Sequence, residues 1–208
     1  MTMRLVHERA VMSLRVMLID QNRSRAAILE QALLDNGYEV VARSSVEDNL
    51  LQRISEAKPD IIIVDMESPD RDTLESMRSI SRDQPRPIVM FTERSDQISI
   101  SEAVKAGVSA YVVDGMNPGR LNAIMEVAIA RFREFQALRN ELEETRNRLE
   151  DRKLIDKARG ILMKHKGMSE SDAYNVLRKM AMDRNIKIGE AARNIITVVD
   201  LLDGDDKP

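Results

Sequence analysis

Residues 59–65 have the sequence PDIIIVD and indicate the fold of the N-terminal half of this 208-residue chain. Four β-branched residues in succession are typical of a strand that is buried on both faces of a parallel sheet. Short apolar runs alternate with segments of helical periodicity on both sides of this stretch. Five β/α repeats predict an α/β fold with a doubly wound parallel sheet, whose functional residues lie at the carboxyl ends of the strands. The other strands are expected at 15–20, 38–42, 87–92 and 110–113, and the helices at 23–36, 46–57, 73–82 and 96–106.

The composition excludes several classes of protein. The chain has no cysteine, which rules out disulfides, thiol catalysis and cysteine-bound zinc, and its two histidines are too few for a histidine-rich metal site. Aromatic residues make up 3% of the chain, which argues against a sandwich or barrel built on aromatic pairs. No apolar run approaches the roughly 18 residues of a membrane span. The N-terminal segment lacks the features of a signal peptide, so we expect a cytoplasmic protein without membrane contact.

Charge is unevenly distributed along the chain. Residues 15–121 hold 13 Lys and Arg against 18 Asp and Glu, a net charge of −5. Residues 151–199 hold 11 Lys and Arg against 6 Asp and Glu, a net charge of +5. An acidic first part and a basic later part indicate two separate roles, and contact with a polyanion is expected for the second.

Four polar residues follow predicted strands, at the edge where such a sheet carries its functional groups: Asp20, Asp65, Thr92 and Asp114. Asp20 and Asp65 offer two carboxylates, which are suitable ligands for Mg²⁺. Asp65 can also act as a nucleophile that forms an aspartyl phosphate. These residues resemble the site of a response-regulator receiver domain. The resemblance implies that Asp65 accepts phosphate, that Asp20 helps to bind Mg²⁺ and that Thr92 contacts the phosphoryl group.

Two positions depart from the receiver pattern. Gln21 follows Asp20 where receivers usually have a second acidic residue, and Asp114 stands where they have a lysine. An anion in place of that cation exchanges an attraction for a repulsion, each of about 1 kcal/mol in water and about 4 near a protein surface. We therefore expect a pseudo-receiver without a bound cofactor, which is switched by a partner protein or by no chemical signal at all. The alternative is phosphorylation of Asp65 with Mg²⁺ at Asp20 and Asp65, and Thr92 can equally cap the following loop.

A long helix is predicted between Pro118 and Lys166, because proline is favoured near a helix start and none follows within this stretch. Apolar residues in it recur at heptad spacing, and opposite charges flank them in a pattern that pairs across a parallel dimer. We expect a short coiled coil that joins two copies of the chain, and the alternative is a solvated interdomain helix. The dimer seam consists of Phe135, Leu138, Leu142 and Leu149.

Three C-terminal helices are expected after this seam. Their segments 156–164 (DKARGILMK), 169–182 (SESDAYNVLRKMAM) and 188–192 (IGEAA) resemble an ANTAR domain, which ends the AmiR/NasR-type transcription antiterminators. Residues 65–72 and 82–92 resemble the NasT-type regulators of nitrate and nitrite assimilation more narrowly. The resemblance implies that this domain binds stem-loops of a nascent leader transcript and prevents a terminator from forming.

Five basic residues are the candidates for RNA contact: Lys157, Arg159, Lys164, Arg178 and Lys179. RNA loops are commonly read by stacking on aromatic rings, and Tyr174 is the one aromatic residue of this segment. Because Tyr174 lies among apolar residues of a helical stripe, packing in the core is favoured over base stacking. The same reasoning favours a packing role for His165.

The sequence thus predicts a dimeric RNA-binding antiterminator rather than an enzyme. A NasS-like partner that senses nitrate or nitrite is expected to control it. The alternatives are a phosphorylation-activated response regulator with the same output and a DNA-binding regulator. The expected parts are an N-terminal extension (1–14), the receiver-like domain (15–121), a coiled-coil linker (122–152), the ANTAR-like domain (153–202) and an acidic tail (203–208).

Overall fold

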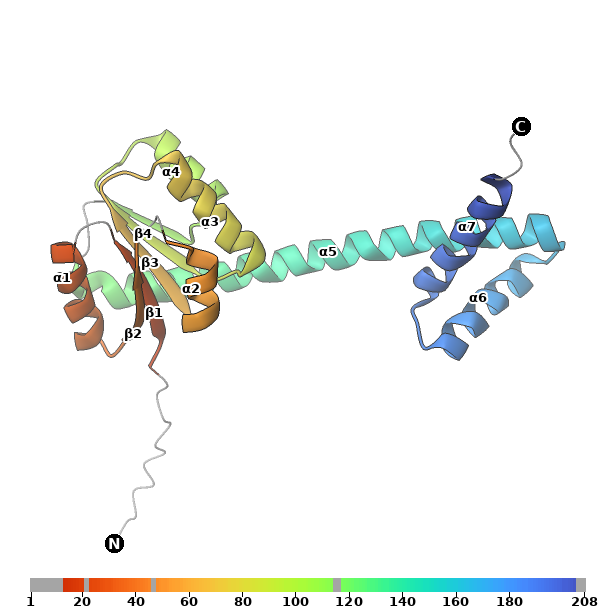
Figure 1. Ribbon diagram of the computed structural model, residues 1–208, viewed down its shortest axis with the longest axis horizontal. Coiled ribbons are helices and arrows are strands. Elements are labelled where there is room, and N and C mark those ends of the chain that lie inside the picture. The colour runs from red at the N-terminus through yellow and green to blue at the C-terminus, as the bar shows by residue number, and fades with distance from the viewer. Residues whose placement is uncertain (1–12, 21–22, 46–47, 114–116, 205–208) are drawn as a thin grey trace, which may run out of the picture. The chain divides into compact units, whose positions relative to one another are not determined.

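The computed structural model describes residues 13–20, 23–45, 48–113 and 117–204, and it forms two compact units, 1–135 and 136–208 (Figure 1). Asp114, Gln21 and most of the two terminal segments lie outside the described residues. Among the helices that are described, none is both long enough and apolar enough to cross a membrane.

The first unit contains a five-stranded parallel sheet with the order β2-β1-β3-β4-β5. This order confirms the predicted doubly wound fold. The strands are β1 (Arg15–Asp20), β2 (Glu39–Ser44), β3 (Ile61–Met66), β4 (Ile88–Thr92) and β5 (Ala110–Val113). The helices are α1 (Arg23–Asp35), α2 (Leu50–Ala57), α3 (Arg71–Asp83), α4 (Gln97–Lys105) and the beginning of α5 (Leu121–Lys166).

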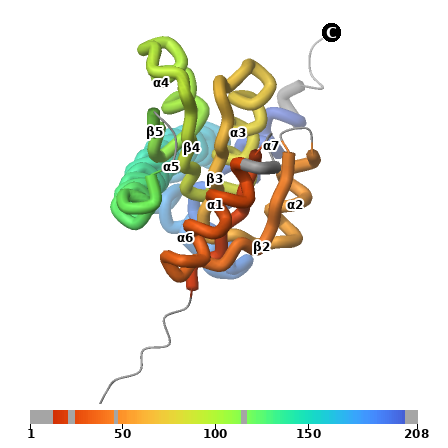
Figure 2. The backbone as a smooth tube through the Cα atoms, turned by 90° about the vertical axis from the view of Figure 1, so that its left-hand side faces the viewer, coloured from red at the N-terminus to blue at the C-terminus, as the bar shows by residue number. Residues whose placement is uncertain are grey.

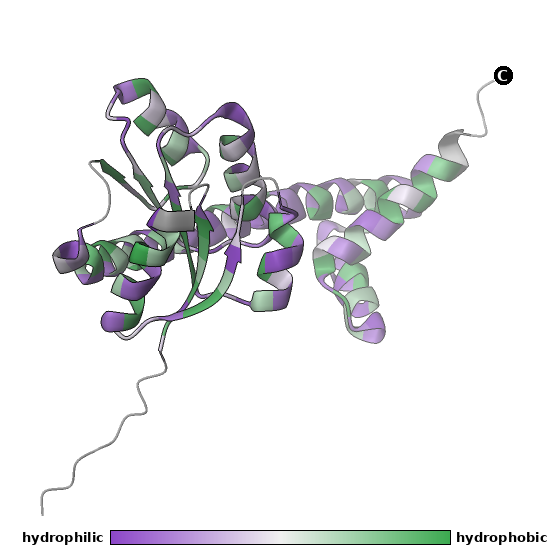
Figure 3. Ribbon diagram, turned by 60° about the vertical axis from the view of Figure 1, so that its left-hand side comes forward, coloured by the Kyte–Doolittle hydropathy of each residue, from purple (hydrophilic) through white to green (hydrophobic). Residues whose placement is uncertain are grey.

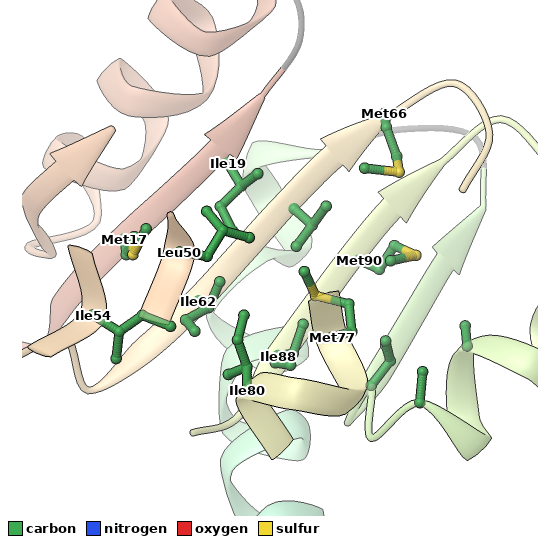
Figure 4. Packing of buried hydrophobic residues seen from close by; sticks show 14 residues of the cluster. Met17, Ile19, Leu50, Ile54, Ile62, Met66, Met77, Ile80, Ile88 and Met90 are labelled. Carbon is green, nitrogen blue, oxygen red and sulfur yellow. The ribbon is translucent and has the colours of Figure 1, made fainter. Parts of the chain in front are cut away.

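Helices cover both faces of the sheet (Figure 2). Along β3 every residue is buried, and successive side chains enter opposite cores. Ile62 and Val64 pack with Leu50, Met77 and other residues of α2, α3 and α4 (Figure 4). Ile61 and Ile63 belong to the core on the other face, formed with α1 and α5. The continuous β-branched run is therefore explained by burial on both sides.

Local capping signals set the helix boundaries. The side chain of Asp70 accepts a hydrogen bond from the Thr73 backbone N–H at 2.7 Å, so α3 begins two residues earlier than the apolar pattern predicted. Asn49 caps α2 in the same way, which moves its start from residue 46 to Leu50. At the end of α1, Gly37 has φ +81°, the left-handed conformation that closes a helix without strain in glycine.

The helix α5 is continuous over 46 residues and confirms the predicted long helix. Its first turns belong to the first unit, because Leu121, Met125 and Ala128 are buried in the core beside α1. The expected start of a linker at residue 122 therefore falls inside this core. Exposed residues then dominate from 133 to 150, the stretch that carries the predicted seam.

The second unit packs the last turns of α5 against α6 (Glu170–Arg184) and α7 (Ile188–Gly204). Its core is built on small residues, with Ala158, Leu177, Ala192 and Ile196 at the centre, and alanines let the three helices approach closely. Hydrophilic and hydrophobic residues alternate along these helices (Figure 3). The predicted inward placement of Tyr174 is wrong, because its side chain is 42% exposed. His165, in the last turn of α5, is exposed as well, so the packing role predicted for it is wrong too.

Candidate functional site

Asp20 and Asp65 occupy the carboxyl ends of adjacent strands and are direct neighbours in the register of β1 and β3. The Asp65 side chain is nearly buried, with 9% of the residue exposed. Burial raises the pKa of Asp65 above its ordinary value, and the negative charges of Asp20 and Glu93 raise it further. Arg25 opposes this effect. The structure thus brings together the two carboxylates that the sequence singled out.

Arg25 and Glu93 were missed by the sequence reasoning. Arg25 lies in the first turns of α1, and its guanidinium is 3.5 Å from the Glu93 carboxylate, directly after β4. The bridge joins α1 to the loop after β4 across the edge that holds Asp65. The position of Arg25 could have been predicted from the sequence. A helix that follows a strand begins at the edge where that strand ends, and Arg25 is only five residues after Asp20, so its side chain is expected near the acidic residues.

The Thr92 hydroxyl is hydrogen-bonded to backbone groups of the loops that follow β3 and β4. Its Oγ1 donates to the carbonyl oxygen of Glu67 at 3.0 Å and accepts from the backbone N–H of Arg94 at 3.1 Å. The Tyr111 hydroxyl donates to the Arg94 carbonyl oxygen at 3.0 Å. These bonds tie the loops after β3 and β4 to each other and to β5, which is the loop-capping role expected as the alternative for Thr92.

The described residues fit a divalent cation incompletely. Asp20 and Asp65 supply two carboxylates, and within the described part of the chain no group of three acidic or histidine side chains is placed to hold a metal ion. The carbonyl oxygen of Glu67 accepts bonds from Thr92 and from the Glu93 N–H.

The RNA-binding candidates of the second unit fall into two groups. Lys164, Arg178 and Lys179 are exposed, and Lys157 is exposed with its Nζ 3.7 Å from Asp200 of α7. Arg159 differs from these, because its guanidinium is 2.7 Å from Glu170 and 3.3 Å from Asp156 and its side chain is 27% exposed. Two carboxylates fix Arg159 in place.

A hollow of about 620 Å³ lies beside Arg159, between α5 and α6. We name it the α5–α6 hollow. Its charged lining comprises Arg148, Arg152 and Arg159 together with Asp151, Asp156 and Glu170, and Ile155 and Tyr174 complete it. The sequence reasoning had considered only Arg159 and Tyr174 of these residues. Five of the others are spaced along one stripe of α5 and Glu170 begins α6, so only the position of α6 turns that stripe into a concave site.

The predicted seam residues lie on the surface of the single chain. Phe135, Leu138, Leu142 and Leu149 are 53–60% exposed. Exposed large apolar side chains at heptad spacing suit a partner helix. The pairing itself remains a prediction.

Residues 16–126 match the response regulator receiver domain, and residues 143–196 match the ANTAR domain. The chain belongs to the ANTAR-containing response regulators. This confirms the resemblance that the sequence motifs indicated. The transcriptional regulatory protein PdtaR of Mycobacterium tuberculosis is 31% identical to this ANTAR response regulator over 182 residues, which cover 88% of this chain and 89% of PdtaR.

Two further comparisons concern parts of the ANTAR response regulator. A nitrate regulatory protein of Klebsiella oxytoca is 48% identical over 65 residues, 31% of this chain and 16% of that protein. A solved response regulator from Thermotoga maritima matches with a TM-score of 0.51 and 21% identity, covering 57% of this chain and 98% of the other. The second likeness concerns the receiver fold alone.

Proposed function

We propose that this ANTAR response regulator is a dimeric RNA-binding antiterminator rather than an enzyme. Its second unit binds stem-loops of a leader transcript and so prevents a terminator from forming. The observation that carries the proposal is the match of residues 143–196 to the ANTAR domain on a unit whose basic side chains are exposed. Lys157 and Lys164 lie seven residues apart on α5 and therefore on one side of the helix, where a phosphate backbone can reach both.

The acidic strand edge supports control by a partner protein rather than by phosphate. Asp65 already faces the negative charge of Asp20, and Arg25 is the cation that the described residues bring to this edge. A phosphoryl group would add nearly two further negative charges beside these carboxylates. The motifs at 65–72 and 82–92, with the partial likeness to a nitrate regulatory protein, favour nitrate or nitrite assimilation as the process and a NasS-like sensor as the partner.

The test is binding to a two-hairpin leader RNA and to a duplex DNA of equal length, each over a series of salt concentrations. The wild type is expected to prefer the RNA at least tenfold. The double variant Lys157→Ala/Lys164→Ala loses two phosphate contacts in each protomer, four in the dimer, so the slope of log K against log salt falls by about 3. The matched control is Arg53→Ala/Lys105→Ala, which removes the same charge from exposed residues of the first unit.

The outcomes separate the alternatives. Equal affinities for RNA and DNA that fall in the same way with salt would contradict the antiterminator proposal and favour a DNA-binding regulator. Phosphorylation control is the second candidate, since Asp65 and Asp20 are neighbours at the carboxyl edge. It predicts that beryllofluoride with Mg²⁺ binds saturably to the wild type and not to Asp65→Asn.

A further inference from the structure

The α5–α6 hollow holds equal numbers of positive and negative groups. Three arginines and three carboxylates line it, so its net formal charge is zero. A phosphate gains little net attraction from such a site, because three anions offset the three cations and Arg159 lies directly beside Glu170 and Asp156. The hollow instead offers fixed hydrogen-bond donors and acceptors side by side. That arrangement suits a neutral, planar, polar group that carries both donors and acceptors of its own.

Arg159 and Glu170 hold the polar wall of the hollow in a set geometry. The guanidinium of Arg159 is bound between Glu170 at 2.7 Å and Asp156 at 3.3 Å. An arginine restrained in this way presents a flat face and leaves carboxylate oxygens beside it that can accept from amino groups of a base. A second hollow, lined also by Ser169 and Ser171, shares Arg159, Glu170 and Tyr174 with the first.

Tyr174 is the aromatic residue of this unit, and it lies in the hollow rather than in the core. Its side chain is 42% exposed, whereas its neighbours Ala173 and Leu177 are fully buried. The hydrophobic cluster of α5, α6 and α7 is formed without it. Packing in the core therefore does not explain a tyrosine at this position. An exposed aromatic ring beside an arginine is the combination on which unpaired bases stack.

We propose that the α5–α6 hollow takes one unpaired base of the RNA loop, which stacks on the Tyr174 ring and bonds through its edge to the Arg159–Glu170 wall. This inference rests on the proposed RNA-binding function and adds to it a site for a base, separate from the lysines that contact phosphate. The two kinds of contact have different salt dependence. Tyr174 contributes affinity that salt does not screen, and Lys157 and Lys164 contribute affinity that salt weakens.

A second copy of the chain is the competing occupant of the hollow. Arg152, Asp156 and Arg159 continue the heptad positions of the seam beyond Leu149, so a dimer mate would pass close to this surface. The charges of the hollow disfavour a second copy as its occupant. An arginine at a core position of a parallel coiled coil would face the same arginine of the mate, and Arg159 is already bound to Glu170 of its own α6.

The experiment compares the full-length wild type with Tyr174→Leu and Tyr174→Phe. Each binds a two-hairpin RNA that carries 2-aminopurine at one loop position at a time, and the same RNA with an abasic sugar at that position of both loops. Tyr174→Leu is expected to bind the intact RNA more weakly by roughly 5- to 100-fold for each base contact that the dimer loses, with an unchanged salt slope. Tyr174→Phe keeps the ring and should bind as the wild type does. At one loop position, the 2-aminopurine fluorescence should be quenched by the wild type and by Tyr174→Phe but not by Tyr174→Leu.

The abasic RNA identifies the contact. The affinity of the wild type should fall by the same factor when the base is removed from the RNA as when Tyr174 is replaced by leucine. Tyr174→Leu should bind the intact and the abasic RNA with equal affinity. Equal binding of the intact RNA by wild type and Tyr174→Leu would overturn the base site while the proposed function stands. A shift of Tyr174→Leu toward monomer in sedimentation, with RNA affinity per dimer unchanged, would assign the hollow to the second copy and also overturn it. Absence of RNA binding by the wild type would remove both proposals.

Discussion

Gly189, in the first turn of α7, lies directly against the carboxylate of Asp151 on α5. A Cβ atom at position 189 would overlap the Asp151 side chain. The contact joins two helices of the second unit at a point where the negative charge of Asp151 meets the N-terminal end of α7, an arrangement that the helix dipole favours. Asp151 also lines the α5–α6 hollow, so this contact positions one of its walls.

Gly189→Ala should therefore destabilise the second unit. The added methyl group forces Asp151 away from the start of α7, and overpacking of this kind costs about 1–3 kcal/mol. Urea unfolding followed by circular dichroism measures the loss. Gly160→Ala is the matched control, because a Cβ at position 160 meets no atom and alanine favours the helix. A loss of equal size in both variants would contradict the contact.

Asp65→Asn should raise the stability of the first unit at neutral pH. Burial and the charge of Asp20 raise the pKa of Asp65 in the folded chain, so the folded state binds more protons than the unfolded state above pH 3.8. The stability of the wild type consequently falls as pH rises from 3.8 through the raised pKa of Asp65. Thermal unfolding should show that Asp65→Asn is more stable than the wild type at pH values above the raised pKa of Asp65. Below pH 3.8 the two proteins should be equally stable. Glu67→Gln, which removes an exposed carboxylate at the same edge, should not reproduce this profile.

Arg25→Ala should destabilise the first unit by about 1 kcal/mol, since Asp20, Asp65 and Glu93 then lose a partly exposed cation. Millimolar Mg²⁺ should raise the melting temperature of the variant more than that of the wild type, because an added cation relieves the repulsion. Glu93→Gln is the control, as it breaks the bridge but removes a negative charge instead of the cation. If Mg²⁺ stabilises Arg25→Ala and the wild type equally, Arg25 does not serve as the neutralising cation.

Ser169→Ala should cost about 1 kcal/mol of stability in the second unit. The Ser169 hydroxyl accepts from the Asp172 backbone N–H at 3.2 Å and donates to the Asp172 carboxylate at 2.7 Å, which caps the start of α6. Denaturant unfolding gives the magnitude. Ser171→Ala changes an exposed serine two residues further on and should leave the midpoint unchanged.

Leu142→Asp should convert the proposed dimer to monomer at micromolar concentration, because it puts a charge into the seam, where the leucine is 53% exposed in the single chain. Asn140→Asp adds the same charge to α5 outside the seam and should remain dimeric. Sedimentation velocity distinguishes them. A wild type that sediments as a monomer would contradict the predicted dimer.

The periodic and local features of the chain were predictable from the sequence. The β-branched run at 61–64, the alternation of strands and helices and the capping serine at 169 depend on neighbours within a few residues, and the structure reproduces them. The convergence of Asp20 and Asp65 was also predictable, because parallel strands end at a common edge. Helix starts shifted by a few residues wherever a cap such as Asp70 precedes the first apolar position.

The sequence by itself therefore determined the two folds and the acidic strand edge, since these follow from periodicity and from bonds between near neighbours. Only the tertiary structure decided which side chains meet across elements. Tyr174 shares its helical stripe with Ala173 and Leu177, and the periodicity could not separate them. Close packing of alanines sets the rotation of α6, and that rotation buries Ala173 and leaves Tyr174 in the hollow beside Arg159. The Arg25–Glu93 bridge, between residues 68 positions apart, likewise exists because the fold brings α1 to the end of β4.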